Sequence, residues 1–290
     1  MLIEVALSGV TLGGMYALVA MGLTLQYGVA RIMNLSYGEL LVAAAFAALW
    51  FYTGLVVSPL LGLLVVPPVA FAASYAIYRL LLQPLVRRAK TRDALEVDSI
   101  LATFGLLFVI QGIMLAIFGG AYHSYSFLAV PVHVLGAIVA ANRLLAFCLA
   151  VVIGLGLWLG LTRTRLGTAV RAVAVDPVAA ELVAIDVRTA SALAFALGGA
   201  LVAAAGVLVS MFLTFNANAG VVFTLKALVV VIMGGVGNLL GALIAGLILG
   251  LTENAVAVFV DPGLTLAATY AVFLLVLLVR PQGLLGRSSR

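Results

Sequence analysis

The sequence predicts an all-α protein that crosses a membrane several times. Hydrophobic residues make up 66% of the 290 residues and charged residues only 9%, and the mean hydropathy is +1.31. Apolar runs longer than about 18 residues recur along the chain, as spanning helices require. Such a segment must satisfy its own backbone groups, which favours helices. Since no sustained alternation of period two accompanies these runs, a membrane β-barrel is excluded.

The chain is expected to form one transmembrane domain over residues 1–290, with no room for a soluble domain beside the spans. The first span continues from the N-terminus and is no cleavable signal, because it carries Glu4 and lacks a basic region before it. Polar or basic stretches separate the later spans. The eight expected apolar segments are 5–28, 34–52, 55–82, 99–118, 144–161, 190–214, 225–251 and 264–279.

Basic residues indicate which side each connection faces. The loop after the third segment carries Arg87, Arg88 and Lys90, and residues 162–189 carry four arginines. Both connections should be cytoplasmic, and the two spans between them agree. The C-terminal arginines Arg280, Arg287 and Arg290 argue for the same side.

Three spans after residue 189 would place the C-terminus on the opposite side. The conflict disappears if residues 221–257 enter and leave the membrane about a hinge at residues 234–238, which read Gly-Gly-Val-Gly-Asn. We therefore expect about eight apolar segments with broken helices, and the number of crossings stays open.

Residues 162–189 are predicted to contain a short helix outside the bilayer. Asp176 followed by Pro177 is a helix start, with a side-chain acceptor at the N-cap and a proline at the first position. From there Val178, Leu182 and Ile185 fall on one face. An amphipathic helix of this kind could dock on a soluble partner. The alternative is a structured cytoplasmic loop.

Two stretches interrupt the pattern of a plain apolar helix. Residues 31–39 contain Asn34, Ser36 and Glu39, and the second stretch is the glycine hinge around Gly235. Irregular backbone at membrane depth occurs only against protein or a water-filled cavity, and paired breaks in transporters mark the substrate path. The alternatives are an interfacial loop for the first stretch and a close-packed small-residue face for the second.

Intramembrane charge is scarce. Only Glu39, Lys226 and Glu253 could lie within spans or at their edges, where each would cost about 2.5–3.5 kcal/mol at the bilayer centre. Lys226 is expected to reach the interface from a helix end. No span carries a carboxylate at its centre, which weakens a proton-coupled mechanism.

Other chemistry is not expected. The chain has no GxxxxGK[ST] phosphate loop and no nucleophile–base constellation, which argues against an ATPase or another enzyme. His123 and His133 have no ligand cluster at metal spacing, so neither a metal nor a cofactor is expected. Cys148 lies in an apolar run and is expected to be a packed thiol. The net charge of +5 indicates topology and no nucleic-acid partner.

Motifs along the whole chain resemble one family, the permease subunits of branched-chain amino acid ABC importers, of the shorter, LivH-like kind. The order and spacing of the motifs carry the resemblance. They are Gly14-Met-Tyr-Ala-Leu-Val-Ala-Met-Gly-Leu23, Asn34-Leu-Ser-Tyr-Gly-Glu39, Gln83-Pro84-Leu85, Thr103-Phe-Gly-Leu106, Phe118-Gly119, Arg171-Ala-Val-Ala-Val-Asp176, Ala194-Phe-Ala-Leu-Gly198, Met233-Gly-Gly-Val-Gly-Asn238 and Arg280-Pro-Gln-Gly-Leu284. Some positions depart from the family pattern. Tyr37 stands where histidine is frequent, and Ala184 and Ala203 stand where glycine is common.

The resemblance implies a multi-pass subunit of the inner membrane that forms half of a translocation path. It implies a second, related permease subunit, two cytoplasmic ATPase subunits and a periplasmic substrate-binding protein as partners. Residues 162–189 would be the coupling segment. The residues expected to couple to the ATPase are Gly167, Arg171, Asp176, Pro177, Leu182 and Ile185. The residues expected to line the substrate pathway are Asn34, Ser36, Glu39, Gly235 and Asn238.

Two alternatives stay open at this point. A secondary transporter driven by an ion gradient would also explain the broken helices. Within the ABC class, the substrate could be a branched-chain amino acid, another small amino acid, or urea or a short amide. Whether the partner permease is a related chain or a second copy is not decided by the sequence.

Overall fold

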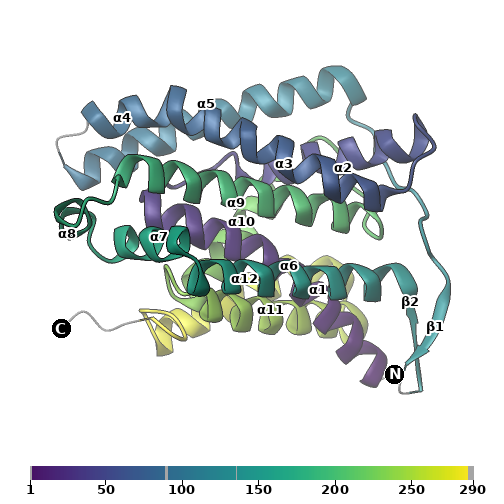
Figure 1. Ribbon diagram of the computed structural model, residues 1–290. Coiled ribbons are helices and arrows are strands. Elements are labelled where there is room, and N and C mark those ends of the chain that lie inside the picture. Colours follow the sequence, from purple (N-terminus) through teal and green to yellow (C-terminus); the bar gives the residue numbers. More distant parts are fainter. Residues whose placement is uncertain (1, 89–90, 135, 287–290) are drawn as a thin grey trace.

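The computed structural model describes residues 2–88, 91–134 and 136–286, which form an elongated bundle of helices (Figure 1). Seven of the described helices are long and apolar enough to span a membrane, and two shorter apolar helices, α2 and α10, accompany them. The helical elements are α1 (Leu2–Leu25), η1 (Gln26–Ala30), α2 (Tyr37–Thr53), α3 (Pro59–Ile77), η2 (Tyr78–Leu82), α4 (Gln83–Arg88), α5 (Arg92–Phe118), α6 (Ala141–Arg163), α7 (Arg165–Val175), α8 (Pro177–Leu182), α9 (Val187–Ser210), α10 (Gly220–Gly234), α11 (Leu239–Phe259), η3 (Pro262–Leu264) and α12 (Thr265–Val279).

The prediction of a polytopic helical membrane protein is confirmed. One feature was not foreseen, a small antiparallel hairpin of β1 (Pro131–Val134) and β2 (Ala137–Ala140), with Pro131 opposite Ala140. The hairpin lies near the N-terminal end of α1, at the end of the bundle opposite α4 and α8 (Figure 1). From the sequence, this stretch was expected to be a polar connection. Each strand has only four residues, which is too short for a clear strand pattern.

The eight apolar segments correspond to nine helices, because the segment at 225–251 is divided. α10 ends at Gly234 and α11 begins at Leu239. The expected break at the glycine hinge is therefore present. It brings the chain after α12 back beside the end of α10, where the Leu284 amide donates to the Met233 carbonyl oxygen at 2.8 Å. The basic segments α4, α7 and α8 lie at this same end (Figure 1).

The core of the bundle is formed by α1 and α9. α1 packs against α11, α9, α6 and α10, and α9 packs against α2 and α3. Glycines allow the closest crossing, since a methyl group at Gly250 in α11 would collide with the Gly13 backbone of α1. Small residues at helix crossings are typical of membrane bundles, in which lipid is as apolar as the side chains.

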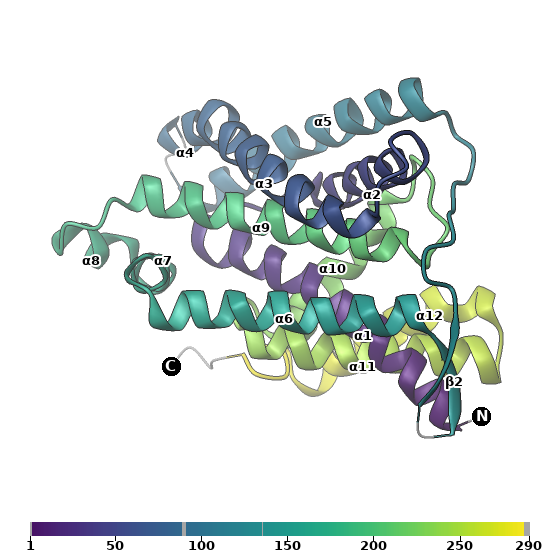
Figure 2. The same ribbon diagram turned by 45° about the vertical axis from the view of Figure 1, so that its right-hand side comes forward.

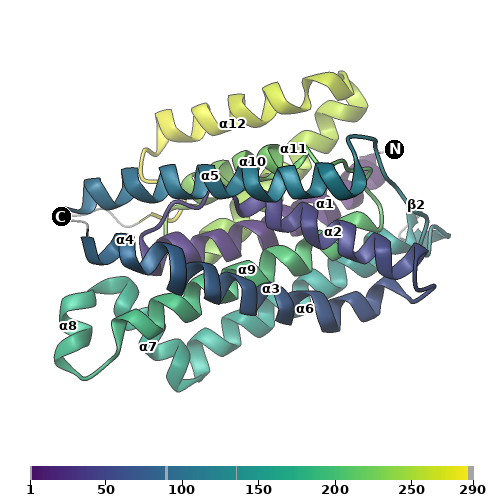
Figure 3. The same cartoon turned by 90° about the horizontal axis from the view of Figure 1, so that it is seen from above.

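The outer helices leave most of their apolar surface uncovered. In the 18-residue apolar stretch that includes α12, only 6% is buried, and in that of α5 only 11% is buried. Seen from above, α12 lies at one edge of the bundle and α6 at the opposite edge, with α5 between them (Figure 3). Such surface requires lipid or another apolar chain against it.

Candidate functional site

The interior of the bundle contains an irregular segment that separates α1 from α2. η1 ends at Ala30, and residues 31–36 are not helical before α2 begins at Tyr37. The Leu35 amide donates to the Thr103 hydroxyl at 3.1 Å. Thr103 lies near the middle of the 27-residue helix α5. The irregular segment is therefore beside the middle of a spanning helix, as the sequence predicted for residues 31–39.

Side-chain amides replace the missing helical hydrogen bonds in this segment. Asn34 is 1% exposed, and its Oδ1 accepts from the Ser36 amide at 3.1 Å and from the Ser36 hydroxyl at 2.7 Å. Its Nδ2 donates to Gln26 Oε1 at 3.1 Å, and Gln26 Nε2 donates to the Phe195 carbonyl oxygen at 2.9 Å. A chain of buried amides thus joins the segment to η1 and to α9. Gln26 was not singled out from the sequence.

The beginnings of α2 and α10 meet in the interior. The Gly38 amide donates to the Thr224 hydroxyl at 2.8 Å. A methyl group at Gly38 would collide with the Gly220 carbonyl oxygen, and one at Gly220 would collide with the Glu39 carboxylate. Both glycines are therefore required by the close approach of the two helices. The positive ends of two helix dipoles converge here on Glu39.

Glu39 is fully buried, and neither carboxylate oxygen has a hydrogen-bond partner among the described residues. The neighbouring Tyr37 is also fully buried, and its hydroxyl donates to the Val19 carbonyl oxygen of α1 at 2.8 Å. Asn34, Ser36 and Glu39 therefore belong to one buried cluster. They line no open passage in this structure.

A polar pair, half-buried at Gln111 and exposed at Asn218, lies beside this cluster. The Gln111 side-chain amide of α5 donates to Asn218 Oδ1 at 2.8 Å, and Asn218 is exposed. Asn216 Oδ1 accepts from the Asn218 amide at 3.2 Å and shapes the turn that leads into α10. The sequence analysis did not identify this turn, although the Asn216-Ala-Asn218-Ala-Gly220 pattern is a turn signal next to an apolar run.

Gly235 and Asn238 lie away from the cluster. Gly235 has φ +101° and lies against Gly286. Asn238 caps α11 by accepting from the Gly241 amide at 3.0 Å, and its Nδ2 donates to the Leu285 carbonyl oxygen at 2.9 Å. The hinge is thus an anchor for the segment after α12. The structure does not bring the five predicted pathway residues together.

A charged network joins four helices where the sequence suggested isolated charges. Lys226 Nζ lies 2.8 Å from Glu253 Oε2 and 2.8 Å from the Tyr16 hydroxyl. The Tyr16 and Thr269 hydroxyls also donate to the Glu253 carboxylate. The expectation that Lys226 extends to the interface is wrong, because its side chain is only 14% exposed. Its partner is 27 residues away along the chain, so local spacing gave no sign of the pair.

The segment at 162–189 contains two helices. Asp176 caps α8 by accepting from the Val178 and Ala179 amides at 2.9 and 3.2 Å, and Pro177 is its first residue, as predicted. Gly167 of α7 packs directly on Gly160 and Leu161 at the end of α6. α7 and α8 extend past the end of α6 (Figure 2).

One part of the predicted amphipathic face is wrong. α8 ends at Leu182, which is 84% exposed, and Ala184 turns the chain with φ +61°. Ile185 therefore does not share a helical face with Leu182. It packs inward against a cluster that includes Val173 and Ala180. Arg171 and Val178 are exposed, as an external contact surface would require.

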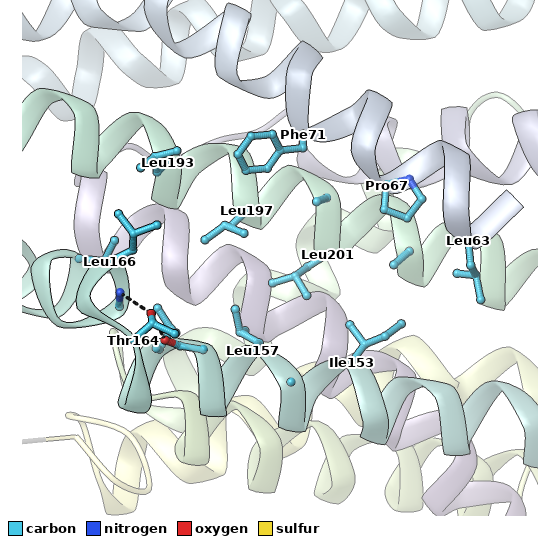
Figure 4. Close-up of a pocket in the computed structure, with 17 residues that line it drawn as sticks. Leu63, Pro67, Phe71, Ile153, Leu157, Thr164, Leu166, Leu193, Leu197 and Leu201 are labelled. Carbon is cyan, nitrogen blue, oxygen red and sulfur yellow. Dashed lines mark hydrogen bonds between the residues drawn. The ribbon is translucent and has the colours of Figure 1, made fainter.

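A cleft of about 530 Å³ opens between α3, α6, α7 and α9 (Figure 4). Its walls are apolar and include Phe71, Leu157 and Leu201. At one end the Thr164 hydroxyl accepts from the Gly167 amide at 3.0 Å. No charged side chain lines the cleft, so it offers nothing to the charged groups of an amino acid.

Cys148 is exposed on α6, so the expected packed thiol is wrong. It lies on a helix face that α1 does not cover, a distinction that an apolar run cannot reveal. Among the described residues, no group of three or more His, Cys, Asp or Glu side chains could hold a metal ion.

Comparisons with known proteins agree with these observations. Residues 5–279 match the family model described as branched-chain amino acid transport system / permease component. The chain is 30% identical to the high-affinity branched-chain amino acid transport system permease protein BraD of Pseudomonas aeruginosa, over 97% of this chain and 94% of that protein. It is equally similar, with the same coverage, to the permease protein LivH of Escherichia coli K12. A probable LivH of Methanocaldococcus jannaschii is 25% identical over 93% of this chain. No solved structure matches.

Proposed function

We propose that this chain forms half of the translocation path of an ABC importer. The chain belongs to the family of permease components of branched-chain amino acid transport systems. The chain is a non-catalytic, multi-pass membrane subunit. In this proposal it lies in the inner membrane and carries branched-chain or other small amino acids. A second, related permease completes the path, two cytoplasmic ATPase subunits hydrolyse ATP, and a periplasmic binding protein delivers the substrate.

The observation that carries the proposed path is the polar pair of half-buried Gln111 and exposed Asn218 at membrane depth. Gln111 lies seven residues before the end of α5, about 10 Å along the helix axis. Polar side chains at such depth face protein or water, because facing lipid is costly. We therefore assign the path to the face on which α5 and α10 lie. The second permease would cover the same face.

The buried cluster of Asn34, Ser36 and Glu39 lies in the interior of the bundle, next to this face. α2 and α10 both begin in the interior, and broken helices with their N-termini inside the protein are typical of transporter binding sites. We propose that Asn34, Ser36 and Glu39 hold the start of α2 in place and contribute to the pathway when the two halves of the bundle move apart. Gly235 and Asn238 would act instead as the hinge at the cytoplasmic end.

The coupling segment has a direct connection to the irregular segment. Arg31 Nη2 donates to the Ala174 carbonyl oxygen of α7 at 3.3 Å, and α7 packs against η1. We propose that the ATPase contacts exposed residues of α7 and α8, namely Arg171 and Leu182, while Gly167, Asp176, Pro177 and Ile185 keep the segment in shape. A displacement of α7 would then reach residues 31–36.

Cysteine labelling tests the path assignment. In a Cys148→Ser background, Asn218→Cys should react with a charged, membrane-impermeant thiol reagent, and saturating branched-chain amino acid should slow the reaction. Val152→Cys is the matched control, because Val152 is 65% exposed on α6, a helix that lies apart from α5 (Figures 1 and 3). It should stay unlabelled. Equal labelling at both positions, or labelling at residue 152 only, would refute the assigned face.

A further inference from the structure

We propose that a pocket between α4 and the start of α9 binds the phosphate headgroup of an anionic phospholipid. The pocket measures about 510 Å³, and its walls include Arg79, Gln83, Arg87 and Arg188. A neighbouring hollow of about 300 Å³ shares the first three of these residues and adds Arg88. Basic pockets between helices on the cytoplasmic side are the sites where anionic headgroups bind.

Gln83 provides the observation that points to a ligand. Its side chain is 7% exposed and lines both hollows, yet its Nε2 has no hydrogen-bond partner among the described residues. A buried donor without an acceptor costs free energy, and native proteins rarely keep one without a reason. A rotation of the Gln83 side chain toward the pocket would allow a phosphate oxygen to accept this hydrogen bond.

The arginines of the pocket are also placed to bind a phosphate group. The Tyr75 hydroxyl accepts two hydrogen bonds from Arg79, at 3.1 and 2.9 Å, and the Thr189 hydroxyl accepts a third at 3.2 Å. Arg79 is thereby fixed at the base of the pocket. Arg87 and Arg188 are exposed and have no ion pair with any described residue. Guanidinium groups bind phosphate oxygens in a forked geometry.

Two acidic residues, Glu181 and Asp186, also line the pocket. The Asp186 carboxylate is already engaged, because it accepts from the Thr189 hydroxyl at 2.5 Å and from the Arg188 and Thr189 amides at 3.0 and 3.2 Å. Across the two hollows, four arginines (Arg79, Arg87, Arg88 and Arg188) outnumber these two carboxylates, so positive charge remains in excess for an incoming anion.

The surroundings favour a lipid over a soluble anion. Leu80 and Leu81 of η2 directly follow Arg79 and are 79% and 41% exposed. This apolar surface lies on a spanning helix and offers a place for acyl chains next to the arginines. A lipid can thus satisfy both parts of the site, while free phosphate satisfies only the polar part.

Native mass spectrometry of the full chain in mild detergent tests the site. Titration with phosphatidylglycerol should give one retained lipid, and Arg87→Gln with Arg188→Gln should weaken its binding about 30-fold, from about 1 kcal/mol for each arginine. The matched control is Arg163→Gln with Arg165→Gln, two exposed arginines at the same end and outside the pocket, whose affinity should stay within about twofold. Gln83→Leu, which removes a buried unsatisfied amide, should keep the fold and weaken lipid binding.

Several results would overturn the proposal. Equal retention of phosphatidylglycerol by the wild type and the pocket variants is one. Equal retention of phosphatidylcholine and phosphatidylglycerol by the wild type is another. Displacement of the lipid by inorganic phosphate alone would assign the pocket to a free anion. Loss of a co-purifying soluble subunit in the pocket variants, with lipid binding unchanged, would make it a protein-docking site.

Discussion

Replacing Lys226 by methionine should destabilise the bundle by about 3–5 kcal/mol, the usual cost of removing one partner from a buried ion pair. The Glu253 carboxylate is 4% exposed and lies 2.8 Å from Lys226 Nζ. Without the ammonium group it keeps only the hydroxyl donors of Tyr16 and Thr269. Glu253→Gln should cost a similar amount, because it leaves Lys226 without its anion.

The double variant, Lys226→Met with Glu253→Gln, distinguishes the loss of the ion pair from the loss of ordinary packing contacts. If the two sites were independent, the costs would add to about 6–10 kcal/mol. Since each single change already removes the interaction, we expect the double variant to lose no more than about 3–5 kcal/mol, a coupling of about 3–5 kcal/mol. Unfolding in mixed micelles with increasing dodecyl sulfate measures all three variants. Additive costs would show that Lys226 and Glu253 do not stabilise each other.

Three further changes test separate parts of the structure. Gly38→Ala should cost about 1–3 kcal/mol or more in the same unfolding assay, because a methyl group has no room against α10. Leu182→Asp should abolish ATPase co-purification without changing membrane insertion, because the side chain is 84% exposed. Asp186→Ala should speed proteolysis of residues 162–189 at neutral pH, since the cap of α9 is lost at a cost of about 1 kcal/mol. The hydrogen bond from the Thr189 hydroxyl lowers the pKa of Asp186 below 3.8, so this stabilisation is present above pH 3.8 and lost as the pH falls through the lower, folded value.

Each of these changes has a control or a contradicting result. Gly105→Ala should be neutral or slightly stabilising, because nothing lies within 4 Å of the added methyl group. An equal loss at Gly38 and Gly105 would disprove the close approach of α2 and α10. Normal ATPase binding by Leu182→Asp would remove α8 from the interface. For Asp186→Ala, a difference from the wild type that persists unchanged below pH 3 would show that the charge plays no part.

Local signals explain why so much of the fold was predictable. The N-cap at Asp176 and the glycine hinge at 234–238 depend on neighbouring residues only, and both are present. The polar residues of segment 31–39 interrupt an apolar sequence, and the helix does break there. Their burial in one cluster follows from the rule that irregular backbone inside a membrane must be covered by protein.

The remaining features depend on contacts between distant residues. Lys226 finds Glu253 from another helix, and Ile185 turns inward because Ala184 adopts a left-handed conformation that a helical wheel does not anticipate. The turn before Gly220 has a local signal, but the meeting of α2 and α10 depends on contacts between distant residues, such as Gly38 with Thr224, which are 186 positions apart. The same holds for Cys148, whose exposure depends on which face α1 covers.

The mass of the intact assembly, purified in mild detergent, shows whether this chain is half of an ABC importer. We expect a complex that contains this chain, a second permease chain and two ATPase subunits. A homo-oligomer without soluble partners would contradict it, above all if vesicles containing this chain alone took up substrate and an ionophore stopped the uptake. That result would assign the chain to transport driven by an ion gradient.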